Sequence, residues 1–230
     1  MIAGVKAVFF DSGGTLTYPT RGTWWPKPRF RELLEGAGFS WPERAAEAAL
    51  AEGSEYLASH PAPDLDSELA TYTEFYRIVL GRLFGRAPAD LVGRLATAAV
   101  YDLDQQPYPD VIPCVNRLSE ASVATAIVSN AGPSLELRYR DMGIREHFDP
   151  FVLSDVVGIR KPSAGIYRLA LDRSGCEAGE VVFVDDIPAN VEAADDVGMR
   201  GVLIERDGGA VADLEGLLEL LGIGAQRARK

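Results

Sequence analysis

The stretch VFFDSGGTLT, residues 8–17, joins three apolar residues to an acid and then to a turn of small residues. Val8 to Phe10 carry the β-branched and aromatic side chains that are favoured in a buried strand. Asp11 follows directly, at the point where this strand ends. Ligands of open parallel sheets bind at the carboxyl ends of the strands. The stretch therefore predicts a functional carboxylate at the edge of such a sheet.

Apolar runs alternate with amphipathic segments along most of the chain, an order typical of βαβ units. The runs that predict strands are Lys6–Phe10, Ala124–Ser129, Pro150–Leu153, Val181–Val184 and Gly201–Ile204. The segments that predict helices between them are Ile112–Glu120, Pro133–Met142, Ser163–Ser174, Ala189–Val197 and Ala210–Leu221. The pattern predicts an α/β fold with a doubly wound, Rossmann-like parallel sheet.

The interval from about Thr20 to Asp104 contains no strand pattern. Its periodicity and its Gly and Pro residues predict a set of helices at Pro28–Gly36, Pro42–Ser59, Leu65–Phe84 and Pro88–Tyr101. We therefore expect two domains. Residues 1–19 and 105–230 form an α/β core domain, and residues 20–104 form an α-helical domain inserted after the first strand.

Composition narrows the functional classes. With 230 residues and 47% hydrophobic content, the chain can bury one α/β core and a smaller second domain. A net charge of −11 disfavours contact with a nucleic-acid backbone. No apolar run approaches the roughly 20 residues of a membrane span, and Cys114 and Cys176 show no metal or disulfide spacing. We expect a soluble cytoplasmic protein without nucleic-acid or membrane partners, and no feature selects an oligomeric state.

Polar residues follow three of the predicted strands. They are Asp11, the pair Ser129-Asn130 and the pair Asp185-Asp186. Because the carboxyl ends of parallel strands share one edge of the sheet, we expect these residues to meet in one crevice. Two close buried carboxylates are costly unless a cation offsets them. Mg²⁺, which prefers carboxylates together with water and phosphate oxygens, is the cofactor that we expect there.

Two further features suit an anionic substrate. Asp11 is followed by Ser-Gly-Gly-Thr, and glycines let backbone N–H groups approach an anion closely. A carboxylate in that position can act as a nucleophile and form a covalent intermediate. Lys161, within Arg160-Lys161-Pro162, can bring the positive charge that an acidic chain needs beside an anion.

Four segments in this order resemble the motifs of the haloacid dehalogenase-like (HAD) hydrolase superfamily. They are FFDSGGTLT, AIVSNAG, VGIRKPSAGIY and VVFVDDIPANVEAADDVGM. The resemblance covers the whole chain, because the helical insert falls where subfamily I of that superfamily places its cap domain. It implies a hydrolase, acting as a phosphatase or phosphotransferase on a small phosphorylated metabolite.

The resemblance also implies a role for each motif residue. Asp11 is the nucleophile that forms an aspartyl-phosphate, and Lys161 stabilises charge on it and on the phosphoryl group. Ser129, Asn130 and Thr15 contact the substrate. Mg²⁺ is held by Asp11, Asp186 and the backbone carbonyl of Gly13, with Asp185 in support.

Gly13 departs from this pattern. Phosphatase members carry a second aspartate there, which protonates the leaving oxygen and then activates water. General acid–base assistance of this kind contributes about 10²–10⁴-fold in rate. An acid from the helical domain or from water could replace it, or the leaving group could need little protonation. Candidates for an acid or a substrate anchor from the helical domain are Arg21, Lys27 and His60.

Three other interpretations stay open. Dehalogenase members need no acid, but they work without metal and lack paired acids such as Asp185-Asp186. Phosphonate-cleaving members have a small residue at this position together with a cap lysine, and Lys27 is the only lysine of the insert. Loss of catalysis would instead leave a binding or regulatory protein.

Overall fold

The computed structural model describes residues 2, 4–20, 28–102 and 104–223. The chain divides into two compact units. The α/β unit comprises Met1–Tyr18, Gln106–Asn130 and Tyr139–Lys230, and the helical unit comprises Pro19–Gln105 and Ala131–Arg138. The predicted α/β class with a parallel sheet is confirmed, and each unit is described by itself below.

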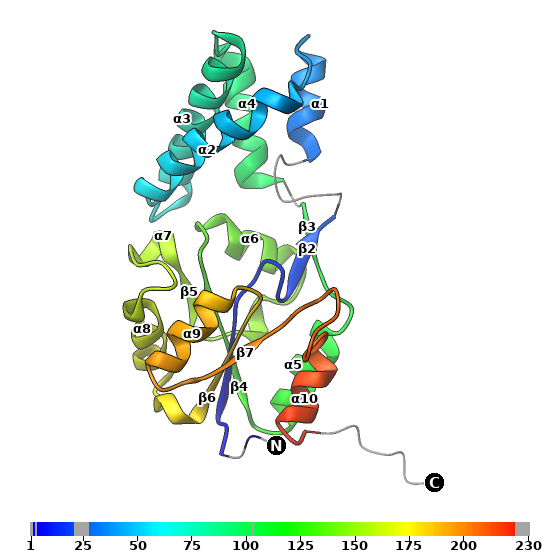
Figure 1. The fold of residues 1–230 in the computed structure, drawn as a ribbon, viewed down its shortest axis with the longest axis vertical. Coiled ribbons are helices and arrows are strands. Elements are labelled where there is room, and N and C mark those ends of the chain that lie inside the picture. The colour runs from blue at the N-terminus through cyan, green and yellow to red at the C-terminus, as the bar shows by residue number, and fades with distance from the viewer. Residues whose placement is uncertain (1, 3, 21–27, 103, 224–230) are drawn as a thin grey trace. The chain divides into compact units, whose positions relative to one another are not determined.

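The α/β unit is built on a five-stranded sheet in the order β5-β4-β1-β6-β7 (Figure 1). Its pairings are all parallel. The strands are β1 (Ala7–Phe10), β4 (Ala124–Ser129), β5 (Phe151–Leu153), β6 (Val181–Asp185) and β7 (Arg200–Leu203). Each lies within one or two residues of the run that predicts it. The nonsequential order leaves β1 at the centre, flanked by strands from distant parts of the chain.

Helices cover both faces of this sheet, with α5 and α10 on one side and α8 and α9 on the other (Figure 1). The helices of this part of the chain are α5 (Val111–Glu120), α6 (Ser134–Asp141), α7 (Ser154–Val157), α8 (Ala164–Ser174), α9 (Pro188–Asp196) and α10 (Leu214–Leu220). Two 3-10 turns, Arg145–His147 and Ala178–Glu180, complete it. The four-residue α7 and both turns have no counterpart among the predicted elements, since segments so short show no periodicity.

Alternating strand residues form the core on the α8 and α9 face. Side chains of a strand point to opposite faces in turn, and Phe9, Val128 and Phe183 therefore share one face. They pack with Ile166 and Tyr167 of α8 in a fully buried cluster. The remaining buried members of the cluster are Ala7, Ala126, Val152, Ala170, Val181, Ala194 and Met199.

The helical unit contains α1 (Pro28–Gly36), α2 (Glu43–Ser59), α3 (Leu65–Phe84) and α4 (Ala89–Tyr101). Local sequence defines both ends of α3. Asp64 and Ser67 form a reciprocal capping box at its start, and Gly85 ends it in the left-handed conformation. A separate apolar core holds the unit together, formed by Phe30, Leu34, Ala49, Phe75, Tyr76, Val79, Leu80, Leu91, Val92, Leu95, Ala96 and Ala99.

The segment Ala131–Arg138 belongs to the helical unit because α3 binds the start of α6. The backbone N–H and the hydroxyl of Ser134 donate to the two carboxylate oxygens of buried Glu68, at 2.8 and 2.7 Å. Arg138 donates to the Ala99 carbonyl at 2.6 Å. A short pairing of β2 (Thr17–Pro19) with β3 (Gln105–Pro107) forms where the chain leaves and re-enters the α/β unit. Three-residue strands of this kind have too little pattern to predict.

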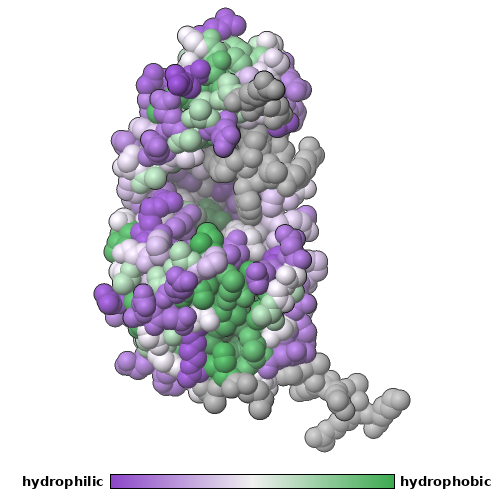
Figure 2. Space-filling view, viewed as in Figure 1, coloured by the Kyte–Doolittle hydropathy of each residue, from purple (hydrophilic) through white to green (hydrophobic). Residues whose placement is uncertain are grey.

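Hydrophilic side chains cover much of the visible surface, and apolar residues gather on one face of the α/β unit (Figure 2). The hydrophilic part of this surface agrees with the 25% of residues in the sequence that are charged. Within the described ranges, none of the helices has the length and apolar character that crossing a bilayer requires.

Candidate active site

The register of the sheet brings the predicted site residues to one edge. Phe10, the last residue of β1, pairs with Ile127 of β4 and with Val184 of β6. The Asp11 N–H continues this ladder by donating to the Val184 carbonyl at 2.9 Å. Asp11, Ser129 and Asp185 therefore come together at the carboxyl ends of three adjacent strands, as the sequence predicts.

Lys161 joins two of these carboxylates. Its ammonium lies 2.6 Å from Asp11 Oδ1 and 2.6 Å from Asp185 Oδ2. The side chains of Lys161, Asp11 and Asp185 are 1%, 11% and 0% exposed, so these pairs are shielded from solvent. The Ser129 hydroxyl donates to the same Asp11 oxygen at 3.0 Å. Two donors on Oδ1 fix the orientation of the Asp11 carboxylate.

Asn130 holds the backbone of Lys161. Its side-chain amide donates to the Lys161 carbonyl at 2.9 Å, and its side-chain oxygen accepts from the Lys161 N–H at 2.8 Å. This two-point contact places the root of the lysine side chain beside the end of β4. The Asn130 carboxamide is thus committed to Lys161, and the contact of Asn130 with the substrate stays a prediction.

Asp185 is saturated with hydrogen bonds. Oδ1 accepts from the Ile187 N–H at 2.8 Å and from the Asn190 amide at 3.1 Å. Oδ2 accepts from Lys161 at 2.6 Å and from the same Asn190 amide at 3.1 Å. Burial, followed by the negative charge of Asp11, raises the pKa of Asp185, and Lys161 opposes that rise. This carboxylate is therefore suited to holding Lys161.

Asp186 completes a group of three acids that suits a hard divalent cation. One oxygen each from Asp11, Asp185 and Asp186 lies within 4.8 Å of the other two. Burial of the carboxyl, together with the charges of Asp11 and Asp185, raises the pKa of Asp186 to about 6. Within this cluster, Lys161 is the cation that contacts the acids, so their negative charge exceeds what it neutralises. The donor set therefore fits Mg²⁺, with Asp11 and Asp186 as the carboxylates that have capacity for it.

The loop after Asp11 is a compact turn. The Leu16 and Thr17 N–H groups both donate to the Ser12 carbonyl, at 2.8 and 2.9 Å. Gly14 has φ +82°, and a β-carbon added there would lie 2.4 Å from Asp186 Oδ2. Gly13 is not among the glycines with positive φ. The two adjacent glycines thus differ, because the backbone requires glycine at position 14 but allows other residues at position 13.

We predict that Gly14→Ala destabilises the protein by about 1–3 kcal/mol, the cost of a strained backbone conformation, and also weakens Mg²⁺ binding. The added methyl group would displace the Asp186 carboxylate. Urea unfolding and Mg²⁺ titration measure the two effects.

Gly158→Ala is the matched control for this prediction. Gly158 has φ +71°, but a β-carbon there would meet no atom within 4 Å. The Gly158→Ala variant should therefore lose stability while keeping the Mg²⁺ affinity of the wild type. Equal Mg²⁺ affinity in the two variants would contradict the contact between position 14 and Asp186.

The other predicted residues lie as follows. Thr15 is fully buried, and its hydroxyl makes no hydrogen bond within the described residues, so its role as a substrate contact stays a prediction. His60 lies in the helical unit, where its Nδ1 is 2.9 Å from the Tyr56 carbonyl. Arg21 and Lys27 lie outside the described residues.

Three residues near the site were not predicted. Asn190 supports Asp185, and the Tyr139 hydroxyl donates to the Ser12 hydroxyl at 2.8 Å. Arg206 donates to the Thr15 carbonyl. Arg206 follows β7 by three residues, so its position just beyond the end of a strand is the signal that marks it in the sequence.

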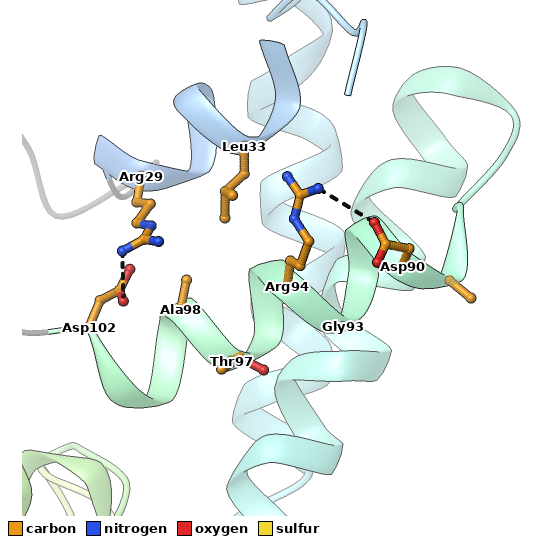
Figure 3. Close-up of a pocket in the computed structure, with 9 residues that line it drawn as sticks. Arg29, Leu33, Asp90, Gly93, Arg94, Thr97, Ala98 and Asp102 are labelled. Atoms are coloured by element: carbon orange, nitrogen blue, oxygen red, sulfur yellow. Dashed lines mark hydrogen bonds and ion pairs between the residues drawn. The ribbon is translucent and has the colours of Figure 1, made fainter. Parts of the chain in front are cut away.

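A pocket of about 550 Å³ lies within the helical unit, between α1 and α4 (Figure 3). Arg29 and Asp102 approach to 3.4 Å in its wall, as do Arg94 and Asp90. Leu33 and Ala98 contribute apolar surface. The residues around Asp11 do not line this pocket, so it is separate from the candidate active site.

Comparison with known proteins agrees with this geometry. A family model described as haloacid dehalogenase-like hydrolase matches residues 5–198. The chain therefore belongs to the haloacid dehalogenase-like hydrolases. It is a hydrolase with a Rossmann-like α/β fold.

Individual relatives include both phosphatases and dehalogenases. The chain is 28% identical over 219 residues to glyceraldehyde 3-phosphate phosphatase of Methanopyrus kandleri, covering 92% of this chain and 88% of that protein. A solved HAD phosphatase from Thermococcus onnurineus matches with TM-score 0.65 and 26% identity, over 96% of this chain and 99% of that one.

L-2-haloacid dehalogenase from Xanthobacter autotrophicus matches with TM-score 0.61 and 25% identity, over 88% of this chain and 78% of that one. Another curated relative is much longer, and its match covers 31% of this chain and 13% of the relative.

Proposed function

We propose that the protein is a Mg²⁺-dependent phosphatase or phosphotransferase that acts on a small phosphorylated metabolite through a phosphoenzyme at Asp11. The observation that carries this proposal is the cluster of three acids around Lys161 at the carboxyl edge of the sheet. The similarity to a phosphatase over 92% of the chain supports it. The buried ammonium and the hydroxyl of Ser129 offer the donors that an anionic phosphoryl group needs.

Each residue contributes to a two-step reaction. Asp11 attacks phosphorus, the bond from phosphorus to the leaving oxygen breaks, and the leaving oxygen departs with the electron pair. Water then attacks phosphorus and releases a proton to solvent, and the bond from phosphorus to the Asp11 oxygen breaks. This restores the Asp11 carboxylate and releases inorganic phosphate. Lys161 and Ser129 stabilise the charge on the transferring group, and Asn130 and Asp185 hold Lys161 in place. A phosphotransferase would use an acceptor hydroxyl instead of water.

Asp11, Asp186 and the Gly13 carbonyl would hold Mg²⁺. When bound, the ion neutralises negative charge on the carboxylates and on phosphate oxygens. We further propose that residues 20–104 act as the cap domain that selects the metabolite.

The acid cluster favours phosphoryl chemistry over dehalogenation. A halide leaves without a proton, and its release needs no metal. A dehalogenase therefore does not require the cation that the negative charges of Asp185 and Asp186 would bind. The intact set of Asp11, Ser129, Lys161 and Asp186 favours an active enzyme over a binding protein. Gly13 supplies no acid, so substrates with good leaving groups should react fastest.

A substrate panel tests this proposal. Phosphate esters, acyl phosphates and haloacids are incubated with the wild type, with and without Mg²⁺, and phosphate and halide are measured. We expect phosphate release that requires Mg²⁺ and is highest for acyl phosphates. Gly13→Asp should raise turnover of simple phosphate esters, by up to about 10²-fold for a restored general acid.

Two outcomes would overturn the proposal. Metal-independent halide release would assign the protein to the dehalogenases. No turnover by the wild type, with phosphatase activity gained in Gly13→Asp, would identify a protein whose catalysis has been lost.

A further inference from the structure

Arg206 connects the nucleophile loop, residues 12–17, to a different part of the α/β unit. Its Nε and Nη2 groups both donate to the Thr15 carbonyl, the former at 3.1 Å. Its Nη1 group lies 2.6 Å from Asp110 Oδ2, and the Arg206 side chain is only 11% exposed. Asp110 Oδ2 also accepts from the Leu214 N–H at 2.8 Å. The guanidinium therefore bridges the loop to the segment that starts α5, with well-shielded hydrogen bonds.

The same guanidinium stacks on Tyr108, which lies close to the point where the chain returns to the α/β unit. Its central carbon lies 4.0 Å from the centre of the Tyr108 ring. The Tyr108 ring lies 4.7 Å from the Tyr18 ring, and the Tyr108 N–H donates to the Leu16 carbonyl at 3.0 Å. Tyr18 is the last residue of the α/β unit before the helical unit, and Tyr108 lies two residues after the chain returns at Gln106.

We propose that Arg206 is a positioning residue that fixes the nucleophile loop relative to both connections of the helical unit. The loop makes internal hydrogen bonds at Gly14, Leu16 and Thr17, and the Thr15 carbonyl at its tip is held by Arg206. A planar guanidinium can supply the two bonds to Thr15, the bond to Asp110 and the stacking on Tyr108 together. A lysine ammonium keeps the positive charge, but it lacks the fixed planar set of N–H donors and the flat surface that stacks on Tyr108.

The catalytic consequence rests on the proposed function. Thr15 lies two residues from Gly13, whose carbonyl is a proposed Mg²⁺ ligand, and four residues from Asp11. A looser loop would misplace both groups in every step of the reaction. Arg206 variants should therefore lower kcat and raise the Mg²⁺ concentration for half-maximal activity, with a smaller change in KM.

Arg206→Lys is the test variant, and Arg117→Lys is its matched control. Arg117 lies in the same unit with a side chain 23% exposed, pairs with Glu215 at 2.5 Å and donates to the Ile223 carbonyl at 2.6 Å. Neither contact involves the nucleophile loop. Amide hydrogen exchange of residues 12–17 is followed by mass spectrometry in full-length, metal-free protein, so this readout needs no substrate.

We expect loop exchange to become about tenfold faster in Arg206→Lys and to stay unchanged in Arg117→Lys, as for a local opening of low-stability structure. kcat should fall by about tenfold in Arg206→Lys only, the size of a modest loss of orientation. Asp110→Asn, which removes the charge partner, should give a smaller effect in the same direction.

Wild-type exchange and kcat in Arg206→Lys would overturn the inference. Equal acceleration in both lysine variants would also overturn it, because that result indicates general loosening of the unit. An inactive wild type whose loop exchange still responds to Arg206→Lys would instead reject the proposed function and leave the positioning role of Arg206 standing.

Discussion

Asp11→Asn is expected to abolish turnover, with a loss in kcat of at least about 10⁴-fold, as for the removal of a catalytic nucleophile. The carboxamide keeps the shape of the side chain and an oxygen for Lys161 and Ser129 to contact. It cannot attack phosphorus and leave again as a carboxylate. The measurements are phosphate release and trapping of the aspartyl-phosphate with hydroxylamine, located by peptide mass spectrometry.

Stability separates this chemical effect from unfolding. Burial, followed by the negative charge of Asp11, raises the pKa values of both Asp185 and Asp186. An acid whose pKa is raised by folding stabilises the folded state below its unfolded pKa, and that contribution is lost as the pH rises through the folded pKa. At pH 8 the negative charge of Asp11 repels the carboxylates of Asp185 and Asp186, and removing that charge relieves part of the repulsion. Metal-free Asp11→Asn should therefore keep or gain stability.

Asp195→Asn is the control carboxylate. Asp195 accepts a hydrogen bond from the Gly201 N–H at 2.7 Å and lies outside the acid cluster. It should keep the phosphoenzyme and turn over at nearly the wild-type rate. Hydroxylamine labelling at another residue, or substantial activity in Asp11→Asn, would remove Asp11 from the role of nucleophile.

The sheet could be predicted because its strands are apolar runs, three of which lead into Asp11, Ser129 and Asp185. The parallel order then requires these ends to share an edge, and the family motifs identify Lys161. The roles inside the cluster follow from three-dimensional contacts that no spacing encodes. One example is that Asn190 occupies both oxygens of Asp185, which leaves Asp186 as the carboxylate with room for a cation.

Arg206 illustrates the same limit at longer range. Its partners at positions 15, 108 and 110 are 191, 98 and 96 residues away in sequence. No local pattern connects them. Arg206 comes close to the loop after β1 because β7 pairs with β6, which in turn pairs with β1. Short elements such as β2 and β3 escape prediction for a related reason, because their pairing depends on where the helical unit departs and returns.

Lys161→Met is expected to cause the largest loss of stability, about 3–5 kcal/mol at pH 8, the cost of leaving a buried charge without its partner. Lys161 is 1% exposed and contacts Asp11 and Asp185, the latter fully buried. Methionine fills a similar volume but neutralises neither carboxylate. Urea unfolding in EDTA measures the loss.

The pH dependence of this variant has a defined sign. Burial raises the pKa of Asp185, and Lys161 opposes the rise, so Lys161→Met should raise it further. Protonation then relieves the uncompensated charge, and the variant should recover stability relative to the wild type as the pH falls from 8 to 5.

The double variant Lys161→Met/Asp185→Asn isolates the pair. Removing the buried charge together with its partner should cost less than Lys161→Met alone, because the asparagine keeps hydrogen-bonding capacity without an unpaired charge. Losses that simply add would show that Lys161 and Asp185 act independently. A coupling of the expected sign would instead show that Lys161 and Asp185 stabilise the fold as a pair, in which Asp185 holds the lysine beside Asp11.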